Sequence, residues 1–211
     1  MSTDAVIAMT ESLYAHWERE AVALPPQIPD FDGSLRPIAC ARGCNHCCKL
    51  EVGGTAAEIL AIKRYAETQA RGSLEKIKTR VRHQRRAIGD KRGADRERMG
   101  LTCPLLGDDG QCLVYPVRPL GCRGIVSCDA EKCREDAENP RTGVRVPYSA
   151  AMRGMARDLS VQLHEAQKAN FGLAGGMFEL VRALSLVWTE PDSEARLLRG
   201  EDVLAPARVP V

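Results

Sequence analysis

The sequence predicts a mainly α-helical fold, in which a small helical domain carries cysteine-rich loops organised around a metal centre. Three observations support this prediction. Apolar residues recur at helical spacing before and after the cysteines, nine cysteines fall into two groups, and the chain lacks alternating strand and helix patterns. A length of 211 residues suits a single domain, residues 1–211, with a metal-binding cysteine-cluster region at 40–133.

The first predicted helix covers the N-terminal stretch and ends before Pro25, Pro26 and Pro29, because proline interrupts helical hydrogen bonding. Its apolar residues share one face: Val6, Met9, Leu13, Trp17, Ala21 and Leu24.

A second helix is predicted to begin after Thr55, since Thr55 and Glu58 have the spacing of a capping box. It is expected to run to about Gln69 with Ile59, Ile62 and Ala66 facing inward. Ser73 is expected to cap a third helix, and residues 89–100, rich in glycine and charge, are expected to form a loop. The apolar face of the third helix comprises Leu74, Ile77, Val81 and Ile88.

Residues 102–124 are predicted to form turns and a short hairpin, and 129–139 a brief helix. Two further helices complete the core, one around 152–166 and a more apolar, central one at 175–188. A last short helix is expected at 191–200, and the tail with Pro206 and Pro210 is expected to be loose.

The N-terminus lacks the basic leader and unbroken apolar segment of a secretory signal, and no apolar run is long enough for a membrane span. These features predict a cytoplasmic protein with no membrane partner. In a reducing cytosol, clustered cysteines favour metal ligation or catalytic thiols over disulfides, and nine is an odd number for full pairing.

The adjacent Cys47 and Cys48 are informative, because neighbouring side chains point in different directions. The easier arrangement sends each sulfur to a different centre, so two centres of four thiolates would use eight of the nine cysteines. The spacing of Cys40, Cys44 and Cys47 is that of three thiolates holding one iron–sulfur cluster. Radical SAM enzymes use such spacing, but the strands and helices of their barrel are lacking here.

Two stretches, "CARGCNHCC" and "CPLLGDDGQCLVYPVRPLGCR", resemble the YkgJ-type or CxxCxxCC cysteine-cluster family, over residues 40–128. The first gap has three residues where the family name implies two. The resemblance implies a zinc- or iron-chelating domain, and some relatives, the flagellin lysine methylases, combine such a cluster with protein methylation. The positions that match are Cys40, Cys44, Cys47, Cys48, Cys103, Pro104, Cys112, Tyr115, Arg118, Pro119, Cys122 and Arg123.

On this basis the expected metal ligands are Cys40, Cys44, Cys47, Cys48, Cys103, Cys112, Cys122 and Cys128. Cys133 lies outside the family pattern and is expected to be the extra thiol. His46, inside the first group, could replace one ligand, but a loop histidine bonded to sulfur or solvent is the favoured interpretation.

An iron–sulfur cluster, most simply 4Fe–4S, is the favoured cofactor. The three-thiolate spacing, the proline after Cys103 and the lack of paired C-x2-C knuckles in the second group all favour it. Structural zinc in a protein-interaction module is the alternative, and a metal-free thiol switch is a third. A redox or protein-modifying role follows from the first choice, and whether the protein is an enzyme stays open.

Arg118 and Arg123 flank Cys122 and are expected to offset thiolate charge or hold an anionic group at the site; surface ion pairing is the alternative. Residues 71–98 hold eleven Lys or Arg against four Asp or Glu, but no aromatic residue interleaves them. A nucleic-acid partner is therefore not expected. The expected partner or substrate is a protein, whose identity the sequence does not give.

Overall fold

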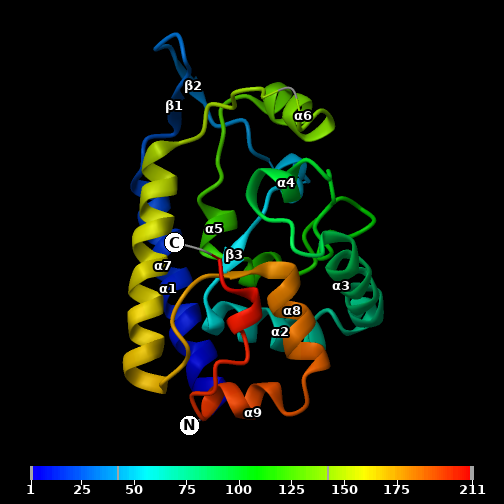
Figure 1. Ribbon diagram of the computed structural model, residues 1–211. Coiled ribbons are helices and arrows are strands. Elements are labelled where there is room, and N and C mark those ends of the chain that lie inside the picture. The colour runs from blue at the N-terminus through cyan, green and yellow to red at the C-terminus, as the bar shows by residue number, and fades with distance from the viewer. Residues whose placement is uncertain (1, 42, 142, 210–211) are drawn as a thin grey trace.

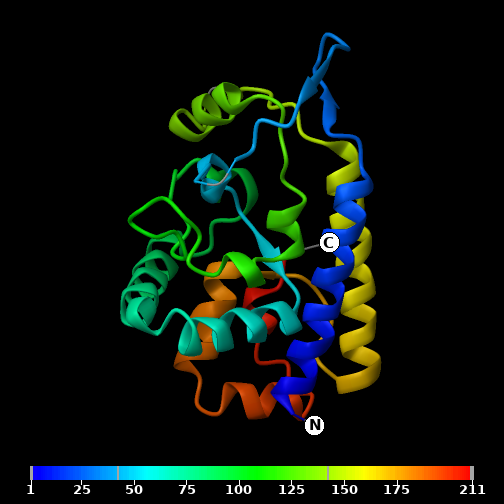
Figure 2. The ribbon, with the colours of Figure 1, turned by 180° about the vertical axis from the view of Figure 1, so that it is seen from behind.

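The computed structural model describes residues 2–41, 43–141 and 143–209 and confirms the mainly α-helical prediction. The two longest helices, α1 (Thr3–Ala23) and α7 (Ala150–Phe171), lie side by side and form one wall (Figures 1 and 2). The other helices and the cysteine loops pack on one side of this wall, and the hairpin of β1 (Gln27–Pro29) and β2 (Leu35–Pro37) projects from one end.

Helix α2 (Ala56–Thr68) is central, because it contacts α1, α7 and α8 (Leu180–Thr189). Helix α8 packs in turn on α3 (Leu74–Ile88) and α9 (Ser193–Leu198). The core is almost wholly aliphatic, as the low aromatic content requires, and its fully buried members include Val6, Ile59, Ile62, Ile77, Ile88, Leu120, Leu163, Phe178, Leu184 and Leu204.

The capping box is confirmed at the start of α2. The Thr55 hydroxyl accepts from the Glu58 amide at 3.3 Å, and the Glu58 carboxylate accepts from the Thr55 amide at 2.8 Å. The helix ends at Thr68 with Gln69 as its C-cap, close to the predicted end. Ser73 is the N-cap residue of α3, as predicted, but its side chain makes no capping hydrogen bond.

The buried face of α1 is more polar than its apolar periodicity predicts. Val6 and Trp17 are buried as expected, but Thr10 and Tyr14 are buried with them. The Thr10 hydroxyl donates to the Val6 carbonyl at 2.9 Å, which satisfies it within the helix.

Several short elements differ from the prediction. Residues predicted as a loop contain α4 (Gly93–Glu97). In the segment predicted to form turns and a short hairpin, Leu106 and Cys112 form one antiparallel bridge, and the 3₁₀ turn η3 (Tyr115–Val117) and α5 (Leu120–Arg123) follow it. The brief helix is confirmed as α6 (Ala130–Glu138), capped by Asp129. The remaining 3₁₀ turns are η1 (His46–Lys49), η2 (Arg71–Ser73) and η4 (Ala205–Ala207).

The C-terminal segment is packed rather than loose. Leu204 and Ala207 are fully buried, and the Val209 amide donates to the Met177 carbonyl at 2.8 Å. Beside it, β3 (Gly53–Gly54) pairs with β4 (Phe178–Glu179), which fixes the chain just after the first cysteine group. Pro210 lies outside the described residues.

No helix in the described ranges combines the length and apolarity needed to cross a membrane.

Replacing Thr55 with Ala is expected to lower the free energy of unfolding by about 1–2 kcal/mol, because it leaves the Glu58 amide without its capping oxygen. Urea denaturation measures the change. Thr68→Ala is the matched control: this hydroxyl is exposed and bonds only its own helix at the Arg64 carbonyl, so the loss should stay below about 0.5 kcal/mol. Equal losses in the two variants would contradict the capping role.

Candidate metal centre

Backbone and side-chain hydrogen bonds join the two cysteine segments. The Cys103 amide donates to the Cys48 carbonyl at 2.7 Å, and the Ala39 amide donates to the Ser127 carbonyl at 2.9 Å. The Ser127 amide also points at the Cys40 sulfur, at 3.4 Å. The early and late cysteine groups therefore lie on the same side of the molecule.

A compact loop presents the sulfurs of Cys103 and Cys112. The Leu113 amide donates to the Leu105 carbonyl at 2.9 Å, and the Gly107 amide to the Gln111 carbonyl at 2.7 Å. A Cβ atom at Gly107 would lie 2.6 Å from Asp109 Oδ1 and 3.1 Å from the Gln111 carbonyl oxygen, so a larger residue would be crowded here. The tight closure of this loop therefore brings Cys112 back beside Cys103.

All nine cysteines lie in the described part of the chain, and each is a free thiol. Within the same residues, no three His, Cys, Asp or Glu side chains are already grouped as ligands of one metal ion. The sulfurs are close enough to shift one another's pKa values, but they do not form a closed coordination shell. Binding a metal would therefore require the side chains to rotate toward a common point.

One set of neighbouring sulfurs comprises Cys40, Cys44, Cys47 and Cys133. Burial, together with the sulfurs of the other three, raises the pKa of the Cys133 thiol to about 11. Burial also raises the pKa of Cys40, and the sulfurs of Cys44 and Cys47 raise it further. Cys133 is carried by α6, which packs on the η1 turn that carries Cys47.

The second set comprises Cys48, Cys103, Cys112 and Cys122. Burial raises the pKa of Cys103 to about 12, with Cys112 as a neighbouring sulfur. Burial also raises the pKa of Cys122, and Cys103 and Cys112 add to it. Cys48 has Cys103 and Cys122 among its neighbours.

The adjacent Cys47 and Cys48 connect the two sets. A hydrogen bond between them lowers the pKa of Cys47, because the thiol of Cys48 stabilises the Cys47 thiolate, and it raises the pKa of Cys48. Cys47 also influences Cys103, Cys112 and Cys122, so it is the sulfur that borders both sets.

No other cysteine is among the groups that chiefly shift the pKa of Cys128. It is buried, and after burial itself the charges that shift its pKa are those of Asp30, Arg36 and Asp129. Asp30 and Arg36 belong to the β1–β2 hairpin, and Asp129 caps α6. The structure thus brings seven of the eight expected ligands together with Cys133 and places Cys128 beside carboxylates and an arginine.

The two arginines beside Cys122 have different surroundings. Arg118 lowers the pKa of Cys40, Cys47, Cys112 and Cys122, and its buried Nε has no hydrogen-bond partner in the described chain. It lies over the Tyr115 ring, 4.1 Å from the centroid. Its charge therefore acts on four of the cysteine thiols.

Arg123 instead hydrogen-bonds to the backbone of the turn at residues 116–118. Its guanidinium donates to the Pro116 carbonyl at 2.6 Å and to the Arg118 carbonyl at 3.1 Å, and it pairs with Glu18. It also lies over the Tyr14 ring at 4.2 Å. Arg123 therefore fixes the turn that carries Arg118, and the structure does not place its own charge among the sulfurs.

Buried Glu58 holds the helix that carries Cys122. Its carboxylate, 1% exposed, accepts from the Leu120 amide at 2.7 Å and from the Tyr14 hydroxyl at 3.4 Å, in addition to Thr55. These bonds connect α1, α2 and the start of α5. Burial raises the pKa of this carboxyl, and the bonds from Leu120 and Thr55 oppose that rise.

Sequence reasoning did not identify Arg96. It lies in α4, within a segment predicted as a loop, yet it is only 2% exposed and donates to the Lys49 carbonyl at 3.3 Å. It lowers the pKa of Cys103, and its buried Nε has no hydrogen-bond partner in the described chain. Nothing in the charged run around it distinguishes it from its exposed neighbours.

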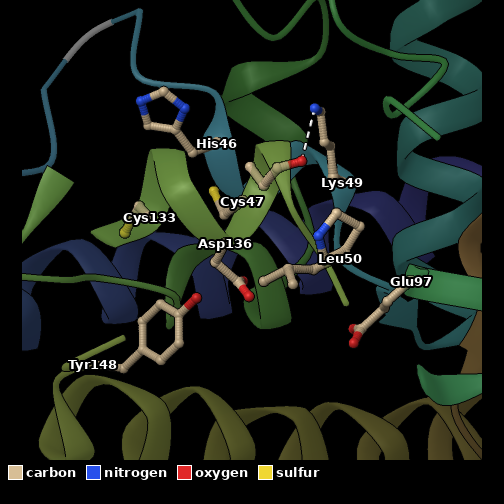
Figure 3. A pocket seen from close by; sticks show the side chains of 10 residues that line it. His46, Cys47, Lys49, Leu50, Glu97, Cys133, Asp136 and Tyr148 are labelled. Atoms are coloured by element: carbon tan, nitrogen blue, oxygen red, sulfur yellow. Dashed lines mark hydrogen bonds between the residues drawn. The ribbon is translucent and has the colours of Figure 1, made fainter. Parts of the chain in front are cut away.

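A small cavity of about 50 Å³ opens beside the first set of sulfurs. Figure 3 shows Cys47 and Cys133 at this cavity with the Asp136 carboxylate and the Tyr148 hydroxyl, and His46 at its edge. The Lys49 ammonium closes one side by donating to the Ala137 carbonyl at 2.9 Å. A space of this size admits water or a comparably small molecule to the sulfurs.

In protein stripped of metal, Cys47 is expected to be alkylated by iodoacetamide at lower pH than Cys103. The thiolate is the reactive form, and the pKa is lowered at Cys47 but raised to about 12 at Cys103. Mass spectrometry of peptides over a pH series measures both sites. Cys48→Ser should move the Cys47 profile and leave that of Cys103 in place. Parallel profiles for Cys47 and Cys103 in the parent protein would contradict the assignment.

Comparison with family models identifies residues 39–140 as a CxxCxxCC domain, described as a "Putative zinc- or iron-chelating domain". Searches of curated proteins and of solved structures gave no match. The matched segment begins just before Cys40 and ends just after α6, so it includes every cysteine of both sets and supports metal binding. Residues 39–140 of the chain thus match the model of the CxxCxxCC cysteine-cluster domain.

Proposed function

We propose that this protein binds metal at two adjacent four-thiolate centres and that the metal is iron, in iron–sulfur clusters. The first centre would use Cys40, Cys44, Cys47 and Cys133, and the second Cys48, Cys103, Cys112 and Cys122. The observation that carries the proposal is the division of eight neighbouring sulfurs into two sets at the Cys47–Cys48 peptide.

The surroundings of the sulfurs fit an anionic metal–thiolate group. Burial raises the pKa of most of these thiols, so their charged forms are stable only when a cation compensates them. Arg118 and Arg96 each have a buried Nε with no partner in the described chain, and their charges lower the pKa of Cys40 and Cys103, respectively. Such donors stabilise the negative charge on cluster or ligand sulfur.

Iron–sulfur ligation is favoured over zinc by the spacing of the first group and by the proline after Cys103. When bound, such a cluster supplies one-electron transfer, which would support a redox or protein-modifying role. A reducing cytoplasm would keep the ligands available as thiols. Structural zinc, with the same ligands, is the second candidate, since a four-thiolate site also suits Zn²⁺.

The chain's own residues define how a reactant would approach the first centre. The cavity beside Cys47 and Cys133 is lined by Asp136, Tyr148 and His46, which can hold or move a proton next to the sulfurs. Its size restricts direct access to water-sized molecules. A larger substrate, such as a protein, would have to exchange electrons with the centre from outside.

Metal identity is tested by purifying the protein without oxygen and measuring iron, zinc and acid-labile sulfide. We expect brown protein with iron and sulfide in equal amounts and visible thiolate-to-iron absorbance. Colourless protein with stoichiometric zinc, unfolded by a chelator, would overturn the iron assignment and keep the thiolate centres. Metal-free protein that forms disulfides on mild oxidation would overturn both.

Replacing Cys133 with Ser is expected to remove one centre and lower the metal content by about half, because a four-thiolate shell loses one ligand. Cys128→Ser is the matched control: it is another cysteine near α6, and its metal content should be unchanged. Elemental analysis of both variants, with circular dichroism to check folding, gives the comparison. Metal loss in Cys128→Ser with retention in Cys133→Ser would reverse the assignment.

A further inference from the structure

A second, larger cavity lies against α5, the helix that carries Cys122. It has a volume of about 590 Å³ and is bordered by α5, α7 and the turn at 176–177. Gly121 and Gly124 form the α5 side, and Ala156 and Ser160 of α7 form the base. Figure 1 shows α5 beside α7 at this level. The volume falls within the range of small-molecule sites in proteins.

The surface of this groove is mainly apolar. Val161 on its rim is 56% exposed, one of five large apolar side chains that stand out into solvent in the described chain, and Ile125 and Met177 contribute from the other side. The small residues of the base keep the groove open. Adding a Cβ at Gly124 would place it 2.5 Å from the Ala156 Cβ, so α5 and α7 are already in close contact below the groove.

The polar groups of the groove are arranged along its length. Arg153 and Arg157 lie one turn apart on α7 and mark one end. Arg157 pairs with exposed Asp158 at 3.3 Å, whereas the Arg153 guanidinium lies over the Tyr148 ring, 5.3 Å from its centroid. Cationic charge is therefore available at this end, because an exposed ion pair exchanges readily for another anion.

The other end carries the His164 ring and the Glu165 carboxylate. His164 accepts from the Gly176 amide at 2.8 Å through Nδ1, and its Nε2 lies 3.4 Å from the Glu165 carboxylate. From Arg153 to His164 the helix advances by about 16 Å at its usual rise per residue. The groove therefore has a cationic end, an apolar middle and an end that is already hydrogen-bonded.

We propose that this groove binds a small amphiphilic anion, a carboxylate or similar group carrying a linear apolar chain. The anionic group would lie against Arg153 and Arg157, and the chain would lie over Ala156, Ser160 and Val161 toward Met177. This site is separate from the thiolate centres and does not depend on which metal they hold.

Isothermal titration calorimetry with decanoate, kept below its micelle-forming concentration, tests the proposal on the protein as purified. We expect saturable binding of one decanoate, and no saturable binding of decyltrimethylammonium, which has the same chain and the opposite charge. Replacing both arginines, Arg153→Met and Arg157→Met, should weaken decanoate binding about tenfold, the usual effect of losing charge-assisted hydrogen bonds.

Val161 provides a variant that does not disturb the core, since its side chain is exposed. Val161→Asp should weaken decanoate binding about tenfold through repulsion and lost apolar contact, and Val161→Asn, of the same size without the charge, should weaken it less. Equal binding of the anionic and cationic amphiphiles, equal behaviour of the Asp and Asn variants, or no saturable binding would each overturn the proposal. Metal analysis of the same samples shows separately whether the thiolate centres are intact.

Discussion

The structure depends on holding many sulfurs together where burial and their mutual closeness disfavour the charged form of each. Burial keeps thiols such as Cys103 and Cys122 protonated until a cation replaces the protons. Metal binding must therefore release protons and supply the free energy that closes the site. The polypeptide contributes by holding the two cysteine loops in register, most directly through the bond from the Cys103 amide to the Cys48 carbonyl.

A few buried polar contacts with the helices hold the two cysteine loops in this position. Glu58 binds the amide at the start of α5, and Arg123 binds the carbonyls of the preceding turn, so the residues on either side of Cys122 are both fixed. Burying such groups is costly unless every one is bonded, and here Glu58 accepts from three different elements. These contacts explain why a site built from loops can have a defined shape.

Local signals predicted much of the fold and long-range contacts decided the rest. The capping box at Thr55 and the apolar face of α3 depend only on neighbours a few residues apart, so the sequence was sufficient. Whether Cys128 or Cys133 joins the sulfurs depends on the direction of the chain entering α6, which spacing does not encode. The burial of Arg96 and the pairing of β3 with β4 likewise join segments far apart in sequence.

In the proposed arrangement, the peptide between Cys47 and Cys48 gives the two centres a shared element of backbone. A rotation of the η1 turn that improved the geometry at one sulfur would also move the other sulfur. Metal occupation of one centre should therefore favour or hinder metal occupation of the second. The same closeness would allow electrons to pass between clusters if both contain iron. A structural zinc site has no use for such coupling, and the adjacency of these cysteines is therefore an argument for a pair of centres that work together.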